Sequence, residues 1–153
     1  MAITATTHLN FRGDARQALE FYQSVFGGHL TVVAYGDFGM PKELPDADKV
    51  VFGQVTAENG FSVAAYDAPS QSPSAPAQTA TTRENGLTLT GERFFVAVGG
   101  DTADEVSDLW NKLSDGAEIV EKLGPSPFSP GFGMLTDRFG VTWILQVNAA
   151  HAG

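Results

Sequence analysis

The sequence predicts an α+β fold in which two βαβββ modules follow one another within a single domain of 153 residues. Residues 15–26 and 103–113 carry apolar side chains at the spacing of amphipathic helices. Strand-like segments flank each helix in the same order, and the two halves share a weak internal repeat. The predicted boundaries are residues 3–67 for the first module, 68–92 for a linker and 93–148 for the second module.

The first module opens with a strand-like segment at residues 6–11. Asp14 has the character of a helix N-cap, and Gln17 stands at the capping-box spacing, so a helix is expected to begin at residue 15. Asn59 and Gly60 predict a hairpin turn between two strands. The remaining strands are predicted at residues 30–35, 50–56 and 61–66, with a loop over 36–48.

The segment 68–92 differs in composition from both modules. Pro69, Pro73 and Pro76 stand among Ser, Ala, Gln and Thr residues. This pattern predicts a flexible linker or an extended loop, with no regular structure over residues 70–83.

The second module repeats the order of the first. Thr102 is a candidate N-cap with Glu105 three residues later, which is again the capping-box spacing. Residues 137–140 are expected to join the last two strands. Strands are predicted at residues 93–98, 118–122, 132–136 and 141–147, with a turn-rich loop over 125–131.

The internal repeat links the two modules directly. Residues 15–22 align with residues 103–110 at an offset of 88, and Gly60 falls on Gly140 at an offset of 80. The alternative is that any α+β chain can contain two helices of similar length. The matched caps and matched strand order favour the repeat.

Composition excludes several classes of function. The formal net charge of −9 argues against nucleic acid and against an anionic membrane surface as partners. The absence of cysteine excludes disulfides, cysteine-ligated metals and thiol nucleophiles. Neither a secretory signal nor an apolar run of about 18 residues is found, so a cytoplasmic location is expected.

Two segments resemble the vicinal oxygen chelate superfamily, which includes glyoxalase I, extradiol dioxygenases and bleomycin-resistance proteins. Residues 18–28, ALEFYQSVFGG, are similar to its first helix, and residues 132–143, FGMLTDRFGVTW, are similar to its closing hairpin, most of all in the PhnB-like branch. The resemblance implies that each sheet curves into a cup with the helix outside and the ligand site within. It also implies a homodimer.

The alternation of side chains along the strands predicts a pocket lining. One parity is uniformly apolar and is expected to pack under the helices: Leu9, Phe11, Phe61, Val63, Ala65, Phe94, Val96, Val98, Val141, Trp143, Leu145 and Val147. The opposite parity mixes polar and apolar groups, as a small-molecule pocket requires. Its candidate ligand-contacting residues are His8, Asn10, Ser62, Tyr66, Phe95, Thr142, Ile144 and Gln146. The alternative is that this parity simply faces solvent.

The resemblance also implies where a metal would bind. Metal-dependent members use one ligand, typically His or Glu, from the first and last strand of each module. The matching positions here are His8, Ala64, Phe95 and Ile144. Since one imidazole does not hold a catalytic metal, no metal or other cofactor is expected, and a divalent ion at His8 is the lesser alternative.

Other residues do not complete such a site. Asp67 ends a predicted strand on the opposite parity from Ala64 and would need a bulge to turn inward. His29 and His151 match no ligand position. No serine elbow or phosphate-binding loop is present, so no catalytic residue is assigned.

Three functions stay open at this stage. The first is a metal-free protein that binds a small aromatic or cationic molecule, for which the net charge and the aromatic residues are suited. The second is a divergent lyase or dioxygenase that uses His8 with unusual ligands. The third is an interaction or regulatory module whose cup has lost its ligand.

Overall fold

A computed structural model of the chain describes residues 3, 5–69 and 80–148. The chain divides into two compact units, residues 1–75 and 76–153, and each unit is described by itself. Most of the proline-rich part of the predicted linker, and His151, lie outside the described residues. No helix in the described part of the chain is long and apolar enough to cross a membrane.

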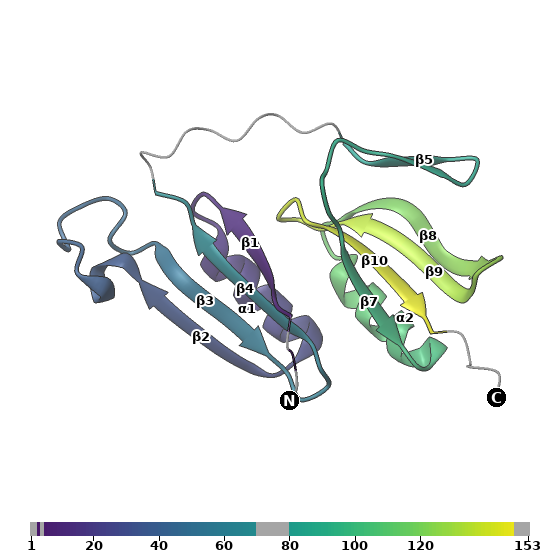
Figure 1. The fold of residues 1–153 in the computed structure, drawn as a ribbon, viewed down its shortest axis with the longest axis horizontal. Helices are drawn as coiled ribbons and strands as arrows, with labels where there is room; N and C mark the ends of the chain where they lie inside the picture. Colours follow the sequence, from purple (N-terminus) through teal and green to yellow (C-terminus); the bar gives the residue numbers. More distant parts are fainter. Residues whose placement is uncertain (1–2, 4, 70–79, 149–153) are drawn as a thin grey trace. The chain divides into compact units, whose positions relative to one another are not determined.

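The first unit is a four-stranded sheet covered on one face by a helix (Figure 1). The strands lie in the order β1-β4-β3-β2, with β1 parallel to β4 and the other neighbours antiparallel. This arrangement confirms the predicted βαβββ module. Its elements are β1 (Thr7–Phe11), α1 (Ala15–Phe26), β2 (His29–Ala34), the 3₁₀ turn η1 (Tyr35–Phe38), β3 (Val50–Thr56) and β4 (Ser62–Asp67).

Helix α1 packs closely on its sheet because β3 presents a glycine to it. A Cβ atom at Gly53 would collide with the side chain of Leu19, so the missing side chain makes room for the helix. The apolar parity of β1 and β4 faces the same way, and Leu9, Val63 and Ala65 are buried there. The helix contributes the rest of this core with Ala15, Ala18, Leu19, Tyr22, Val25 and Phe26.

A buried carboxylate satisfies the N-terminus of α1, and it is not the one that the sequence predicted. Asp14 is the N-cap residue but makes no side-chain capping hydrogen bond. Instead, Oδ1 of Asp67 accepts the backbone N–H groups of Gly13 (2.7 Å) and Ala15 (3.0 Å). Its Oδ2 accepts the N–H of Val50 at 2.9 Å. Asp67 therefore joins the end of β4 to the start of the helix and to the start of β3.

The second unit repeats the same plan, with strand order β7-β10-β9-β8 and β7 parallel to β10. The predicted cap is confirmed here, since Oγ1 of Thr102 accepts the N–H of Glu105 at 3.2 Å. Gly133 of β9 gives room to Trp110 of the helix. The elements of this module are β7 (Val96–Gly100), α2 (Ala103–Leu113), β8 (Glu118–Ser126), β9 (Ser129–Thr136) and β10 (Thr142–Val147).

The structure differs from the sequence prediction at the start of this module. Phe94 was expected to pack under a helix, but it is exposed. The reason is that β7 begins only at Val96, so the strand alternation does not reach Phe94.

A hairpin stands where a flexible linker was expected. Residues 82–89 form β5 (Thr82–Glu84) and β6 (Leu87–Leu89), which pair in antiparallel register. Asn85 (φ 52°) and Gly86 (φ 77°) make the turn with two left-handed residues, the backbone that an Asn-Gly pair favours. This part of the linker prediction is corrected, because the turn signal outweighs the loop-like composition around it.

Candidate functional site

Among the described residues of the first unit, α1 covers one face of the sheet and no helix covers the other. Because Gly53 points toward α1, its neighbours on β3 point to the opposite face. The predicted residues on β1 and β4 lie on that side as well. We call this surface the open face, and its central residues are His8, Asn10, Phe52, Gln54, Ser62, Ala64 and Tyr66.

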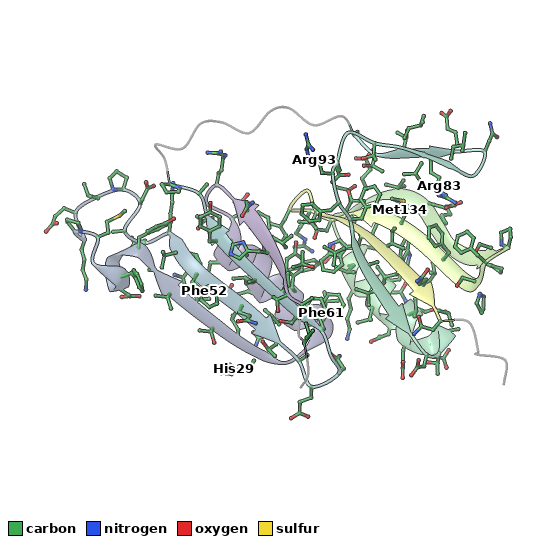
Figure 2. All side chains as sticks on the ribbon, viewed as in Figure 1. His29, Phe52, Phe61, Arg83, Arg93 and Met134 are labelled. Carbon is green, nitrogen blue, oxygen red and sulfur yellow. The ribbon has the colours of Figure 1, made fainter. Side chains whose placement is uncertain are left out.

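Three rings lie on three neighbouring strands of the open face. The rings of His8 on β1 and Tyr66 on β4 meet edge to face, with centroids 5.3 Å apart. Phe52 directly precedes Gly53, the partner of Ala65, so it lies on the strand beside Tyr66. Phe52 is 41% exposed, and His8 is exposed as well. The three rings form an aromatic row that solvent reaches (Figure 2 labels Phe52).

Hydrogen-bonding groups stand beside this row. Asn10 pairs in register with Tyr66 and is exposed. The Nε2 of Gln54 donates to the Oγ of Ser62 at 3.2 Å, and the hydroxyls of Thr6 and Ser62 are 3.1 Å apart. The structure thus brings the predicted residues His8, Asn10, Ser62 and Tyr66 together on one face.

Tyr35 lies at one end of this unit; the sequence places it among the aromatic residues near the expected cup but not among the candidate ligand-contacting residues. Its hydroxyl donates to the backbone oxygen of Asp67 at 2.8 Å. Burial, and then the neighbouring Tyr66, Asp67 and Asp46, raise the pKa of Tyr35 above its ordinary value of 10.0. Tyr35 is therefore a neutral hydrogen-bond donor at physiological pH and ties η1 to the end of β4.

The other predicted site residues lie in the second unit. Thr142, Ile144 and Gln146 alternate along β10 with Trp143 and Leu145, which are buried in the core. Phe95 precedes β7 and is half-buried.

The face that carries these residues is covered, in contrast to the first unit. Thr142 is only 2% exposed, and its hydroxyl donates to Oε2 of Glu92 at 2.7 Å. Thr81 donates to the same carboxylate oxygen. Met134, which pairs with Ile144, is 1% exposed. The segment around the β5–β6 hairpin therefore closes much of this face.

The register of the strands corrects one match between the modules. His8 pairs with Ala64, and Ala97 pairs with Ile144. Because the closing hairpins of the two modules align at an offset of 80, His8 corresponds to Ala97 and not to Phe95 as predicted. The second module has one residue fewer between its first strand and its helix, and the prediction placed this gap in the wrong direction.

The residues at the implied metal positions do not fit a metal. His8 is the only one of them with a ligating side chain, since the others are Ala64, Ala97 and Ile144. Asp67, the candidate replacement, is 1% exposed and is used by three backbone N–H groups on the helix side. Over the described residues, no group of three or more His, Cys, Asp or Glu side chains could hold a metal ion.

Comparison with known proteins identifies the family. The model of the glyoxalase/bleomycin resistance protein/dioxygenase superfamily matches residues 7–145. The chain belongs to this superfamily. Among proteins with curated descriptions, none matches the chain.

Solved structures agree with this assignment. Protein PA1353 from Pseudomonas aeruginosa is 25% identical, with a TM-score of 0.77 over 96% of this chain and 98% of its own. The PhnB protein from Bacillus cereus is 26% identical, with a TM-score of 0.65 over 95% and 100%. TioX from Micromonospora sp. ML1, at 14% identity, 97% and 100% coverage and a TM-score of 0.53, shares the fold. The PhnB similarity agrees with the resemblance found in the sequence.

Proposed function

We propose that this superfamily member binds a small planar aromatic molecule on the open face of its first unit, without a metal ion. The observation that carries the proposal is the aromatic row of His8, Tyr66 and Phe52. A flat ligand can stack on or between such rings, each contact contributing about 0.5–1.5 kcal/mol beyond the area buried. A solvated structural face has little need for three adjacent rings.

The polar groups beside the row support a ligand with at least one hydrogen-bonding heteroatom. Asn10 and Gln54 offer amide donors and acceptors, and Ser62 and Tyr66 offer hydroxyls. Among the seven residues that define the open face there is no carboxylate. This composition favours an aromatic heterocycle over a strongly charged compound.

Binding of quinoline and indole, measured by NMR titration of isotope-labelled protein, tests the proposal. Both compounds are expected to shift the amide signals of β1 and β4 and to saturate. His8→Ala and Tyr66→Ala should each weaken binding by about tenfold, the loss of one ring contact with its buried area. Cyclohexanecarboxamide, whose ring is saturated and offers no aromatic face, should not bind.

His29→Ala is the matched control variant. His29 is an exposed histidine of β2, at the other edge of the same sheet, three strand spacings or about 14 Å from β1. The variant should bind quinoline as the unaltered protein does. The proposal would be contradicted if the His8→Ala and Tyr66→Ala variants, both shown to be folded, bound quinoline as tightly as the unaltered protein does.

Elemental analysis tests the metal-free part separately. Protein purified with added Ni²⁺, Zn²⁺, Mn²⁺ or Fe²⁺ is expected to carry substoichiometric metal after dialysis, because one imidazole is a poor site. A stoichiometric ion that is lost in His8→Ala would instead support a metal-dependent lyase or dioxygenase.

A further inference from the structure

The covered face of the second unit contains an arginine from its own hairpin. Arg83 of β5 lies over the ring of Phe132, with its guanidinium carbon 5.0 Å from the ring centroid. Its Nε forms an ion pair with Oε2 of Glu121, and its Nη1 donates to Thr88 at 2.8 Å. Figure 2 labels Arg83 near the β8–β9 side of the sheet.

Strands β8 and β9 place the carboxylate of Glu121 and the ring of Phe132 on the same face of the sheet. The register between β8 and β9 shifts on both sides of Glu121, and such bulges turn a side chain away from its regular direction. Phe132 lies next to Gly133, which faces Trp110 of the helix, so Phe132 faces the opposite side. The rings of Phe128 and Phe132 meet edge to face, with their centroids 5.0 Å apart.

We propose that Glu121 and Phe132 form a binding subsite for an organic cation that carries a guanidinium group, and that Arg83 fills this subsite when no such ligand is bound. A planar guanidinium stacks on an aromatic face and pairs with a carboxylate at the same time. Arg83 makes both contacts. The net charge of −9 favours the approach of a cation.

The way in which the hairpin is attached allows Arg83 to leave. The base of the hairpin is held by Glu92, which accepts from Thr81 and Thr142, independently of Arg83. The outward side chains Leu87 and Leu89 are exposed, so the tip buries little apolar surface. The side chain of Glu121 is 40% exposed, but the Oε2 atom that Arg83 contacts is buried, so a ligand reaches this oxygen once Arg83 has moved away.

Titration with ethylguanidinium, a copy of the end of an arginine side chain, tests this inference by calorimetry and NMR. In Arg83→Ala the subsite is vacant, and saturable binding is expected that shifts the signals of Phe132 and Glu121. In the unaltered protein the apparent affinity should be at least about tenfold weaker, because the vacant form would be a tenth of the population or less. Ethylurea, which is neutral and of the same size, should bind neither form.

Arg93→Ala is the matched control, because it removes the same charge from an exposed arginine between the hairpin and β7. It should behave as the unaltered protein does. In the double variant Arg83→Ala, Glu121→Gln the binding of ethylguanidinium should be lost. If Arg83→Ala does not fold, the titration is made with Arg83→Gln, which keeps most of the side chain but removes the charge.

The inference is overturned if neither folded Arg83 variant binds ethylguanidinium, or if both bind it no better than Arg93→Ala. It is also overturned if the double variant Arg83→Ala, Glu121→Gln binds ethylguanidinium as tightly as Arg83→Ala does. The result does not depend on the proposed function of the first unit. Binding there is tested on β1 and β4 with quinoline and indole.

Discussion

The two units share one βαβββ plan but treat the free face of the sheet in opposite ways. In the first unit the aromatic row of His8, Tyr66 and Phe52 is open to solvent. In the second, the β5–β6 hairpin, which Figure 1 shows beside the sheet of this unit, brings Arg83 over Phe132, and Met134 is almost fully buried. The cover of the second unit comes from the segment that precedes β7. The same scaffold can therefore leave this face open or cover it with its own chain.

The units also differ in how they satisfy the start of the helix. In the second unit Thr102 caps its own helix from an adjacent position. In the first, Asp67 reaches α1 from the last strand and holds the start of β3 as well. A local cap stabilises one helix, whereas Asp67 joins three elements.

Asp67→Ala is expected to produce the largest loss of stability. It leaves three backbone N–H groups without their acceptor, and the free energy of unfolding should fall by about 3–5 kcal/mol. Thr102→Ala, the corresponding change in the second unit, should cost about 1 kcal/mol. Urea unfolding followed by circular dichroism measures both.

Asp14→Ala is the control for this comparison. Asp14 occupies the N-cap position but makes no capping hydrogen bond, so its loss should cost less than about 1 kcal/mol, from the helix dipole alone. If Asp14→Ala proved as destabilising as Asp67→Ala, the assignment of the capping role to Asp67 would be wrong.

Gly86→Ala should weaken the cover of the second unit. A Cβ atom there would touch nothing within 4 Å, so the change acts through the left-handed backbone and costs about 1–2 kcal/mol. The hairpin should open about tenfold more often. The oxidation of Met134 by hydrogen peroxide, followed by mass spectrometry, should accelerate accordingly.

Met40 is an internal reference for that experiment, because it lies in the first unit and is half-buried. Its oxidation rate should not change in Gly86→Ala. Acceleration at both methionines would indicate general unfolding and not an opening of the hairpin.

Tyr35→Phe is expected to have the smallest effect, with a dependence on pH. At pH 7 the lost hydrogen bond to Asp67 should cost about 0.5–1.5 kcal/mol. Because folding raises the pKa of Tyr35 above 10.0, its stabilisation is complete below pH 10 and is lost as pH rises through the folded pKa. The gap between the two proteins should therefore narrow above pH 10, as measured by urea unfolding at each pH.

Local patterns predicted most of the fold. The apolar spacing placed both helices at their observed bounds, residues 15–26 and 103–113, and the cap at Thr102 is confirmed. The cap of α1 was missed because Asp67 is more than fifty residues away, and no local spacing reveals such a partner. The Asn85–Gly86 turn carried a clear signal, but the proline-rich segment before it concealed the hairpin.

The residues that share the open face were predictable where strand alternation is regular. His8, Asn10, Ser62 and Tyr66 lie on one face, as the period of two requires. Arg83 and Glu121 could not be found in this way. One sits in the assumed linker, and the other lies between two bulges that break the alternation of β8.

The two glycines that make room for the helices show where the two modules differ in length. Gly53 and Gly133 are 80 residues apart, whereas the helix N-caps Asp14 and Thr102 are 88 apart. The missing residues fall in the connection between the second and third strands, which is long in the first unit and only two residues in the second. If the halves arose by duplication, a connector was gained or trimmed while every strand was retained. An engineer who wishes to graft a new loop onto this scaffold should begin at that connection.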